Sequence, residues 1–159
     1  MENKITIYTD GSALGNPGAG GYGTVLLSGH FRREISQGFR HTTNNRMELL
    51  SVIVGLEAIR RDGALVTIYS DSKYVVDAVE KRWVFAWEKK NFKEKKNADL
   101  WQRFLVVYRR HSVRFVWVKG HAENVENNRC DYLATSAARG EVLLVDDQYE
   151  LLCVGGRVV

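Results

Sequence analysis

Proline and cysteine are scarce in this chain, and long apolar runs are missing. Its 159 residues include one proline, Pro17, and two cysteines, Cys130 and Cys153. Two isolated cysteines make neither a disulfide framework nor a paired metal motif, so a reduced, cytoplasmic compartment is expected. No apolar run reaches the roughly eighteen residues of a membrane span. The N-terminal "MENKITIYTD" also lacks the basic start and apolar block of a signal peptide.

The net charge of +4 comes mainly from one segment. Residues 81–96 contain seven basic and two acidic side chains, a net +5, which leaves 16 basic and 17 acidic residues elsewhere. Trp83, Phe85, Trp87 and Phe92 are interleaved with these cations. A solvated helix face is one interpretation. Aromatic rings beside lysines also offer stacking together with phosphate neutralisation, which favours a nucleic-acid surface.

Hydrophobic periodicity predicts a single α/β domain with a mixed sheet. Strands are expected over residues 4–11, 21–29, 32–39, 64–71 and 112–121, and helices over residues 42–63, 72–83, 97–111 and 126–140. This order predicts a five-stranded sheet with an antiparallel start of three strands, then parallel strands, flanked by helices. Residues 141–159 are apolar enough to pack against the domain, but the pattern does not predict their position in the fold.

The stretch "ALGNPGAGGYGTVLL" contains five glycines, of which Gly18, Gly20 and Gly23 match the letters of a dinucleotide-binding turn. Such a turn leads into a helix, whereas residues 22–27 are aromatic, β-branched and aliphatic with no helical period. A phosphate-binding G-K-[ST] motif is also absent. The glycines therefore predict a tight loop after Asp10 whose backbone lies close to another chain; a hairpin turn that needs positive φ is the alternative for several of them.

Carboxylates follow two apolar strands at equivalent places, Asp10 in "IYTDGS" and Asp71 in "IYSDSK". If these strands are parallel neighbours, both carboxylates leave the sheet at one edge. Glu48 lies early on the first helix and Asp131 early on the last. Four such acids would repel one another unless a metal lay between them, and oxygen ligands suit Mg²⁺. For any one acid alone, a turn or cap role is the alternative.

Five motifs together resemble one known family. In order, they are "TDGSALGNPGAGGYG", "TTNNRMEL", "SDSKYV", "NADLWQ" and "WVKGHAENVENNRCDYLA". They resemble type 1 ribonuclease H, the bacterial ribonuclease HI kind, from about Ile5 to Ala138. The resemblance implies a ribonuclease H-like fold, with a catalytic domain over 1–140 and a tail of unknown role over 141–159. It also implies a monomer without a small-molecule cofactor.

The implied reaction is endonucleolytic hydrolysis of the RNA strand of RNA·DNA hybrids, giving 5′-phosphate and 3′-hydroxyl ends. By similarity, Asp10, Glu48, Asp71 and Asp131 would hold two Mg²⁺ ions, with Mn²⁺ as a possible substitute. One ion would activate the attacking water, and the other would stabilise the leaving oxygen. His121 matches a loop histidine that assists proton transfer or product release in the family.

Other residues resemble family contacts to the hybrid. Asn16, Asn44 and Asn45 resemble residues that grip its minor groove, where amides can donate to and accept from 2′-hydroxyls and base edges. For Asn44 and Asn45, helix capping is the alternative. Thr43 and Asn97 resemble a pocket for a phosphate of the DNA strand.

Aromatic and basic side chains resemble the family's residues that line the path of the DNA strand. Tyr74 and Trp83 match aromatics along this path, although Trp83 and Trp87 are four residues apart and could both be helix core. The family's basic protrusion is matched by Lys89, Lys90, Lys93, Lys95 and Lys96.

The chain also departs from the family pattern. The protrusion between Trp87 and Asn97 is shorter, His41 replaces a frequent arginine, Lys73 replaces a neutral amide, and "GHAENVEN" lacks the usual Gly and Pro. Three alternatives stay open: a non-catalytic hybrid-binding module, another metal-dependent nuclease on the same fold, and a basic domain that binds phosphates alone.

Overall fold

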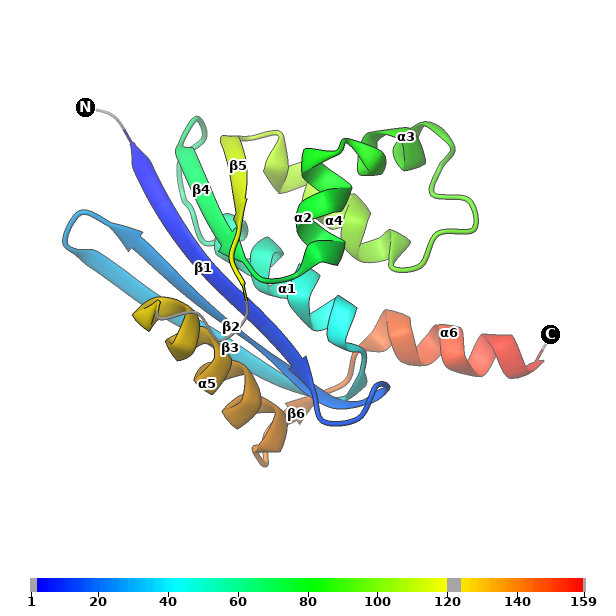
Figure 1. The fold of residues 1–159 in the computed structure, drawn as a ribbon. Coiled ribbons are helices and arrows are strands. Elements are labelled where there is room, and N and C mark those ends of the chain that lie inside the picture. The colour runs from blue at the N-terminus through cyan, green and yellow to red at the C-terminus, as the bar shows by residue number, and fades with distance from the viewer. Residues whose placement is uncertain (1–2, 120–123, 159) are drawn as a thin grey trace.

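The computed structural model describes residues 3–119 and 124–158, and it shows one sheet with helices on both faces (Figure 1). The strands are β1 (Lys4–Ala13), β2 (Gly18–Ser28), β3 (Phe31–Thr42), β4 (Leu65–Ser70), β5 (Ser112–Trp117) and β6 (Leu143–Leu144). The helices are α1 (Asn44–Glu57), α2 (Lys73–Glu80), α3 (Trp83–Lys89), α4 (Ala98–Tyr108), α5 (Val125–Arg139) and α6 (Asp147–Val158).

The strand order is β5-β4-β1-β2-β3-β6. Strands β1, β2 and β3 are antiparallel neighbours, while β4 pairs in parallel with both β1 and β5, as predicted. The sheet has six strands rather than five, because β6 pairs in parallel with β3 at Gly38 and Phe39. A strand of two residues is too short to show a period of its own.

The helical region after β4 is divided more finely than the sequence pattern predicts. The helix expected over residues 72–83 ends at Glu80, and α3 begins at Trp83 after Arg82, whose φ is 63°. A left-handed residue cannot continue an α-helix, so the chain turns there. Val84 is fully buried, which fixes α3 against the rest of the molecule.

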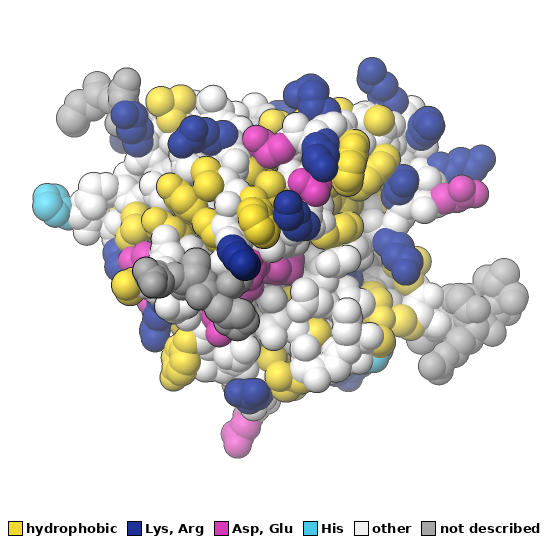
Figure 2. All heavy atoms as spheres, in the orientation of Figure 1, with side chains coloured by type: hydrophobic (Ala, Val, Ile, Leu, Met, Phe, Trp, Pro, Cys, Tyr) yellow, Lys and Arg dark blue, Asp and Glu magenta, His cyan; other side chains and the backbone are white. Residues whose placement is uncertain are grey.

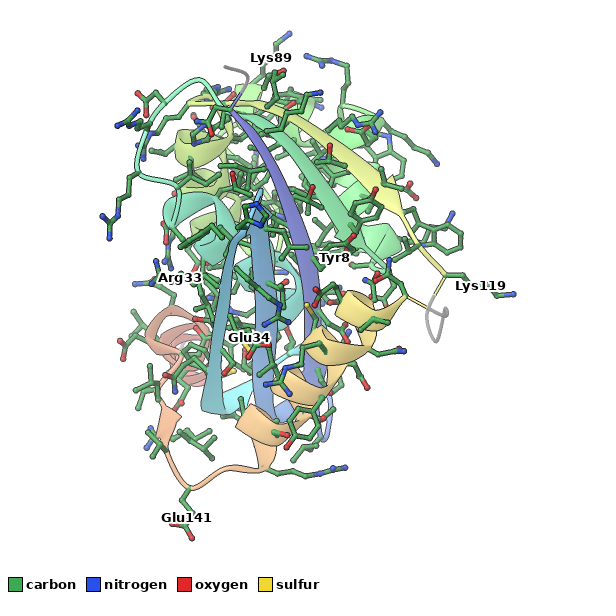
Figure 3. All side chains as sticks on the ribbon, turned by 90° about the vertical axis from the view of Figure 1, so that its left-hand side faces the viewer. Tyr8, Arg33, Glu34, Lys89, Lys119 and Glu141 are labelled. Atoms are coloured by element: carbon green, nitrogen blue, oxygen red, sulfur yellow. The ribbon has the colours of Figure 1, made fainter. Side chains whose placement is uncertain are left out.

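The core lies between the sheet and the layer of α1, α2 and α4. Ile7 of β1 and Ile68 of β4 lie side by side on neighbouring strands, and both are fully buried. Trp101 and Phe104 of α4 pack edge-on within the same core. Across the other sheet face lies α5 (Figures 1 and 3). None of the described helices is long and apolar enough to cross a membrane.

The glycines after Asp10 lie mostly in β2 rather than in a loop, which corrects that expectation. Only Gly15 lies in the connection between β1 and β2. A Cβ on Gly23 would meet the carbonyl oxygen of Cys130, so glycine here lets α5 lie close to β2. The close approach is therefore made by a helix of the same chain.

A buried ion-pair network holds the C-terminal tail to α1. Arg46, which is 2% exposed, donates from Nε to Asp146 Oδ2 at 2.8 Å and from Nη2 to Asp99 Oδ2 at 2.7 Å. Thr42 Oγ1 donates to the same oxygen of Asp146 at 2.7 Å. Because a buried guanidinium needs such partners, α1, α4 and the start of α6 are fixed relative to one another.

Candidate active site

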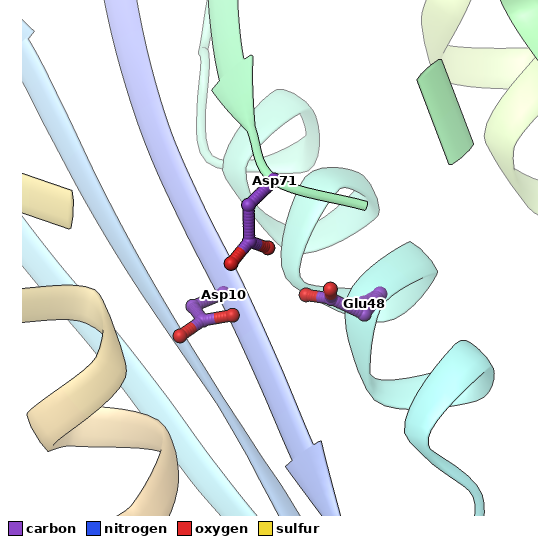
Figure 4. Close-up of side chains that lie close together, drawn as sticks. All are labelled: Asp10, Glu48 and Asp71. Carbon is purple, nitrogen blue, oxygen red and sulfur yellow. The ribbon is translucent and has the colours of Figure 1, made fainter. Parts of the chain in front are cut away.

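Three carboxylates from separate elements converge at the carboxyl end of β4, where its pairing with β1 stops and β1 itself continues to Ala13. Asp10 lies on β1, Glu48 on α1 and Asp71 directly after β4. One oxygen from each lies within 4.8 Å of the others. Figure 4 shows the three side chains pointing toward one another. Because β1 and β4 are parallel neighbours, Asp10 and Asp71 leave the sheet at the same edge.

Local structure positions Asp10 and Glu48. A Cβ on Gly11 would meet the backbone of Met47 and Glu48, so β1 lies directly against α1 beside Asp10. Thr43 is the N-cap of α1 and accepts a hydrogen bond from Arg46 N at 3.2 Å, which places Glu48 in the second turn. The cap is therefore Thr43, and neither Asn44 nor Asn45 has that role.

Burial and like charge raise two of the pKa values. Burial, followed by the charges of Asp71 and Asp131, raises the pKa of Asp10 to about 8. Burial, followed by the charges of Asp10 and Asp71, raises the pKa of Glu48 well above its usual range. Without a cation, the cluster therefore retains protons at neutral pH that isolated carboxyls would lose.

The oxygens of this cluster fit a divalent metal ion. Glu48 is 6% exposed, and its Oε1 is buried with no hydrogen-bond partner among the described residues. Asn127 Oδ1 is also buried with no hydrogen-bond partner among the described residues. Asn127 lines a small cavity together with Asp10 and Asp71. Carboxylate and amide oxygens suit Mg²⁺, and such a cation would satisfy atoms that the described residues leave unpaired.

Asp131 lies at the rim rather than in the group of three. It is exposed on α5 and lines a cavity of about 40 Å³ with Asp10 and Asp71. Asn127, which sequence reasoning missed, lies one turn before Asp131 and lines the same cavity. Its spacing of four residues from Asp131 was the available signal. Lys119 and Asn128 complete this lining and were also missed; Lys119 lies near the start of α5 (Figure 3).

The expected proton-transfer residue, His121, lies outside the described residues. The described chain resumes at Asn124, which caps α5 by accepting hydrogen bonds from Glu126 N and Asn127 N at 2.9 and 3.1 Å. This cap fixes the turn of α5 that bears Asn127 beside the acids.

A second cavity, of about 450 Å³, brings together most of the expected minor-groove and phosphate contacts. Its lining includes Asn16, Thr43, Asn45, Lys96 and Asn97. Two further lining residues come from the tail and were not predicted, Tyr149 and Leu152.

Hydrogen bonds join other predicted contacts to this second cavity. Asn44 N donates to Asn16 Oδ1 at 3.1 Å, which ties the β1–β2 connection to the start of α1. Tyr74 OH accepts hydrogen bonds from Asn97 Nδ2 at 3.0 Å and Trp101 Nε1 at 2.9 Å. Tyr74 therefore helps to hold the Asn97 side chain in place at the second cavity.

The basic segment forms α3 and the connection to α4. In Figure 2, Lys and Arg side chains gather at the upper right, over α3. All five expected lysines are exposed, and a groove of about 500 Å³ is lined by Trp87 together with Lys90, Lys93 and Lys95.

The aromatic residues of this segment differ in exposure. Trp83 is 46% exposed, whereas Phe92 is 5% exposed and belongs to the core. Trp87 packs edge-on against Trp101, with ring centroids 5.9 Å apart. The prediction that Phe92 offers a stacking surface to nucleic acid is therefore wrong, because its ring is buried in the core and anchors the protrusion.

Comparisons with known proteins identify the family. The ribonuclease H family model matches residues 2–139. Ribonuclease H of Syntrophus aciditrophicus (strain SB) is 52% identical over 153 residues, covering 93% of this chain and 88% of that protein. Ribonuclease H of Rippkaea orientalis is 52% identical over 152 residues, covering 92% and 93%.

Solved structures agree with this assignment. LC9-RNase H1, described as a type 1 RNase H with the type 2 active-site motif, has a TM-score of 0.80 at 33% identity, covering 89% of this chain and 75% of that one. LC11-RNase H1, solved with an RNA/DNA hybrid, has a TM-score of 0.68 at 25% identity, covering 85% and 96%. With its sheet order and carboxylate cluster in place, this chain belongs to the ribonuclease H family, in the type 1 branch.

Proposed function

We propose that this protein hydrolyses the RNA strand of RNA·DNA hybrids endonucleolytically and leaves 5′-phosphate and 3′-hydroxyl ends. The observation that supports this most strongly is the convergence of Asp10, Glu48 and Asp71 in a member of the ribonuclease H family. A solved relative that contains an RNA/DNA hybrid supports the choice of substrate.

The catalytic acids are Asp10, Glu48, Asp71 and Asp131, and together they would hold two Mg²⁺ ions, with Mn²⁺ as the substitute. When bound, such ions activate a water molecule and stabilise negative charge on the leaving oxygen. The raised pKa values of Asp10 and Glu48 mean that these carboxyls give up protons as they become ligands. Metal affinity should therefore increase with pH.

The second cavity binds the hybrid beside the acids. Asn16, Asn44 and Asn45 grip the minor groove, and the hydrogen bond between Asn44 and Asn16 organises this grip before the hybrid arrives. Thr43 and Asn97 hold a phosphate of the DNA strand, with Asn97 oriented by its bond to Tyr74.

The basic protrusion follows the DNA strand away from the site. The exposed ring of Trp83 offers a stacking or packing surface along this path. Phosphates are neutralised by Lys89, Lys90, Lys93, Lys95 and Lys96, all exposed.

Proton transfer or product release is assigned to His121, since a histidine titrates in the relevant pH range. The matched catalytic residues all lie within residues 1–140, and the tail packs onto this domain through β6 and Asp146. The protein acts as a monomer in the cytoplasm and needs no small-molecule cofactor. These assignments rest on the family and on the positions of the matched residues.

The test compares cleavage of RNA·DNA, RNA·RNA and DNA·DNA duplexes of one sequence, with Mg²⁺ and with EDTA. We expect internal cuts in the RNA of the hybrid only, in Mg²⁺ only, with products that carry a 5′ phosphate. Degradation from the ends would favour the exonuclease alternative. Equal binding of all three duplexes without any cleavage would favour the basic binding domain and contradict the proposal.

A further inference from the structure

Helix α6 contributes one wall of the cavity that Thr43 and Asn97 line. Tyr149 and Leu152 are the lining residues from this helix. They are three residues apart, so they lie on the same helix face. The preceding residue, Leu151, is 64% exposed but is not part of the lining.

Ion pairs hold α6 in this place. Asp146, directly before the helix, is buried between Arg46 and Thr42. Glu150 in the first turn accepts two hydrogen bonds from Arg40, at 2.8 and 2.9 Å. The helix is thus fixed to β3 and α1 at its start, close to Thr43.

The ring of Tyr149 is fixed as well. Its centroid lies 5.5 Å from that of the His41 ring and 5.9 Å from the guanidinium carbon of Arg46. His41, one of the departures from the family pattern, therefore packs against the tail in this chain. These contacts hold the ring at the edge of the cavity.

The lining has two chemical halves. The hydroxyl of Thr43, the amides of Asn45 and Asn97 and the ammonium of Lys96 make one half polar and basic. The ring of Tyr149 and the side chain of Leu152, which is 63% exposed, make the other half largely apolar. A phosphate ester of a sugar has the same division, because its anionic oxygens adjoin a ring bearing C–H groups.

We propose that α6 belongs to the hybrid-binding surface, with Tyr149 and Leu152 packing against the sugar of the DNA nucleotide whose phosphate Thr43 and Asn97 hold. This inference rests on the proposed function, because that function supplies the DNA strand. It assigns a binding role to the tail that the sequence pattern left without one.

The test introduces a negative charge at two neighbouring positions of α6. Leu152→Glu adds it inside the cavity, and the matched control Leu151→Glu adds it to the same helix outside the lining. Affinity for a blunt RNA·DNA hybrid is measured in EDTA, and cleavage in Mg²⁺ gives KM and kcat. Thermal melting of both variants checks that α6 stays in place.

Leu152→Glu should weaken hybrid affinity and raise KM by about fivefold, the effect of one unit charge near a phosphate in water, while kcat stays the same. Leu151→Glu should leave hybrid affinity and KM close to the wild-type values. Equal effects of the two variants, or none, would overturn the role of α6. If the wild type binds the hybrid without cutting it, the proposed catalysis fails, yet the affinities still decide the role of α6.

Discussion

Gly11 lies in direct contact with the backbone of Glu48, and this contact brings β1 and α1 together at the carboxylate cluster. A Cβ at residue 11 would overlap backbone atoms of Met47 and Glu48, which cannot move aside as a flexible side chain can. The spacing between Asp10 and Glu48 therefore depends on the absence of a side chain at Gly11.

Gly11→Ala should separate the two acids and lower kcat by about a hundredfold, the cost of misplacing a catalytic group by around 1 Å. It should also lower the free energy of unfolding by about 2 kcal/mol through overpacking. Steady-state cleavage and urea unfolding measure both effects. Gly140→Ala is the matched control, since its Cβ would come no closer than 3.3 Å to a neighbour. Similar losses in both variants would contradict this account.

Asp10→Asn should change how the stability of the metal-free protein depends on pH. The pKa of Asp10 is raised from 3.8 to about 8, so the folded protein binds more protons than the unfolded chain between these values. The contribution of Asp10 to stability is thus fully present below about pH 4 and is lost as pH rises toward 8. The variant should be more stable than wild type by several kcal/mol near pH 8 and similar near pH 4.

Urea unfolding in EDTA at the two pH values measures this difference. Excess Mg²⁺ should then stabilise the wild type near pH 8 more than the variant, because only the wild type keeps the full ligand set. A variant that is less stable than wild type at both pH values would show that burial and the neighbouring charges do not raise the pKa of Asp10.

Much of this architecture could be predicted from the sequence, because the long strands and helices have clear periods. Asp10 and Asp71 could be placed together because each comes directly after an apolar run on a parallel strand, although Asp10 lies within β1, which continues to Ala13. Strand β6 and the break at Arg82 could not be predicted, because a two-residue strand and a single left-handed residue leave no periodic signal. Tyr149 was missed because only tertiary packing brings it to the second cavity, whereas Asn127 could have been found from its spacing of four residues from Asp131 on one helix face.

Asp146→Asn should loosen the tail, because it removes one of the two negative charges that pair with the buried Arg46. We expect the free energy of unfolding to fall by about 2 kcal/mol, since Asn can still accept hydrogen bonds but cannot neutralise the guanidinium. The matched control is the exposed neighbour Asp147→Asn, with an effect below about 0.5 kcal/mol. Equal urea midpoints for the two variants would argue against the buried network.

Replacing Lys90, Lys93 and Lys95 together with Ala should weaken hybrid binding and flatten its salt dependence. Each lost phosphate contact should reduce the slope of log affinity against log salt by about one. kcat at saturating hybrid should stay the same, because these lysines lie outside the carboxylate cluster.

The matched control removes the same charge elsewhere, as Arg33, Arg60 and Arg61 to Ala. These arginines line a separate cavity with Ile5 and Leu26, and among the described residues they form no ion pair. Binding isotherms at several salt concentrations compare the two triple variants. Equal slopes in both would mean that net charge, rather than the protrusion, governs the affinity.

The most direct test of the carboxylate site is the turnover of Asp10→Asn on a saturating RNA·DNA hybrid in Mg²⁺, with hybrid affinity measured in EDTA alongside. Because Asp10 belongs to the group of three carboxylates and also lines the cavity that Asp131 lines, we predict a fall in turnover of at least about a thousandfold, with hybrid affinity in EDTA not weakened. Mg²⁺-dependent turnover close to that of the wild type would contradict the assignment of the Asp10, Glu48 and Asp71 cluster as the catalytic centre.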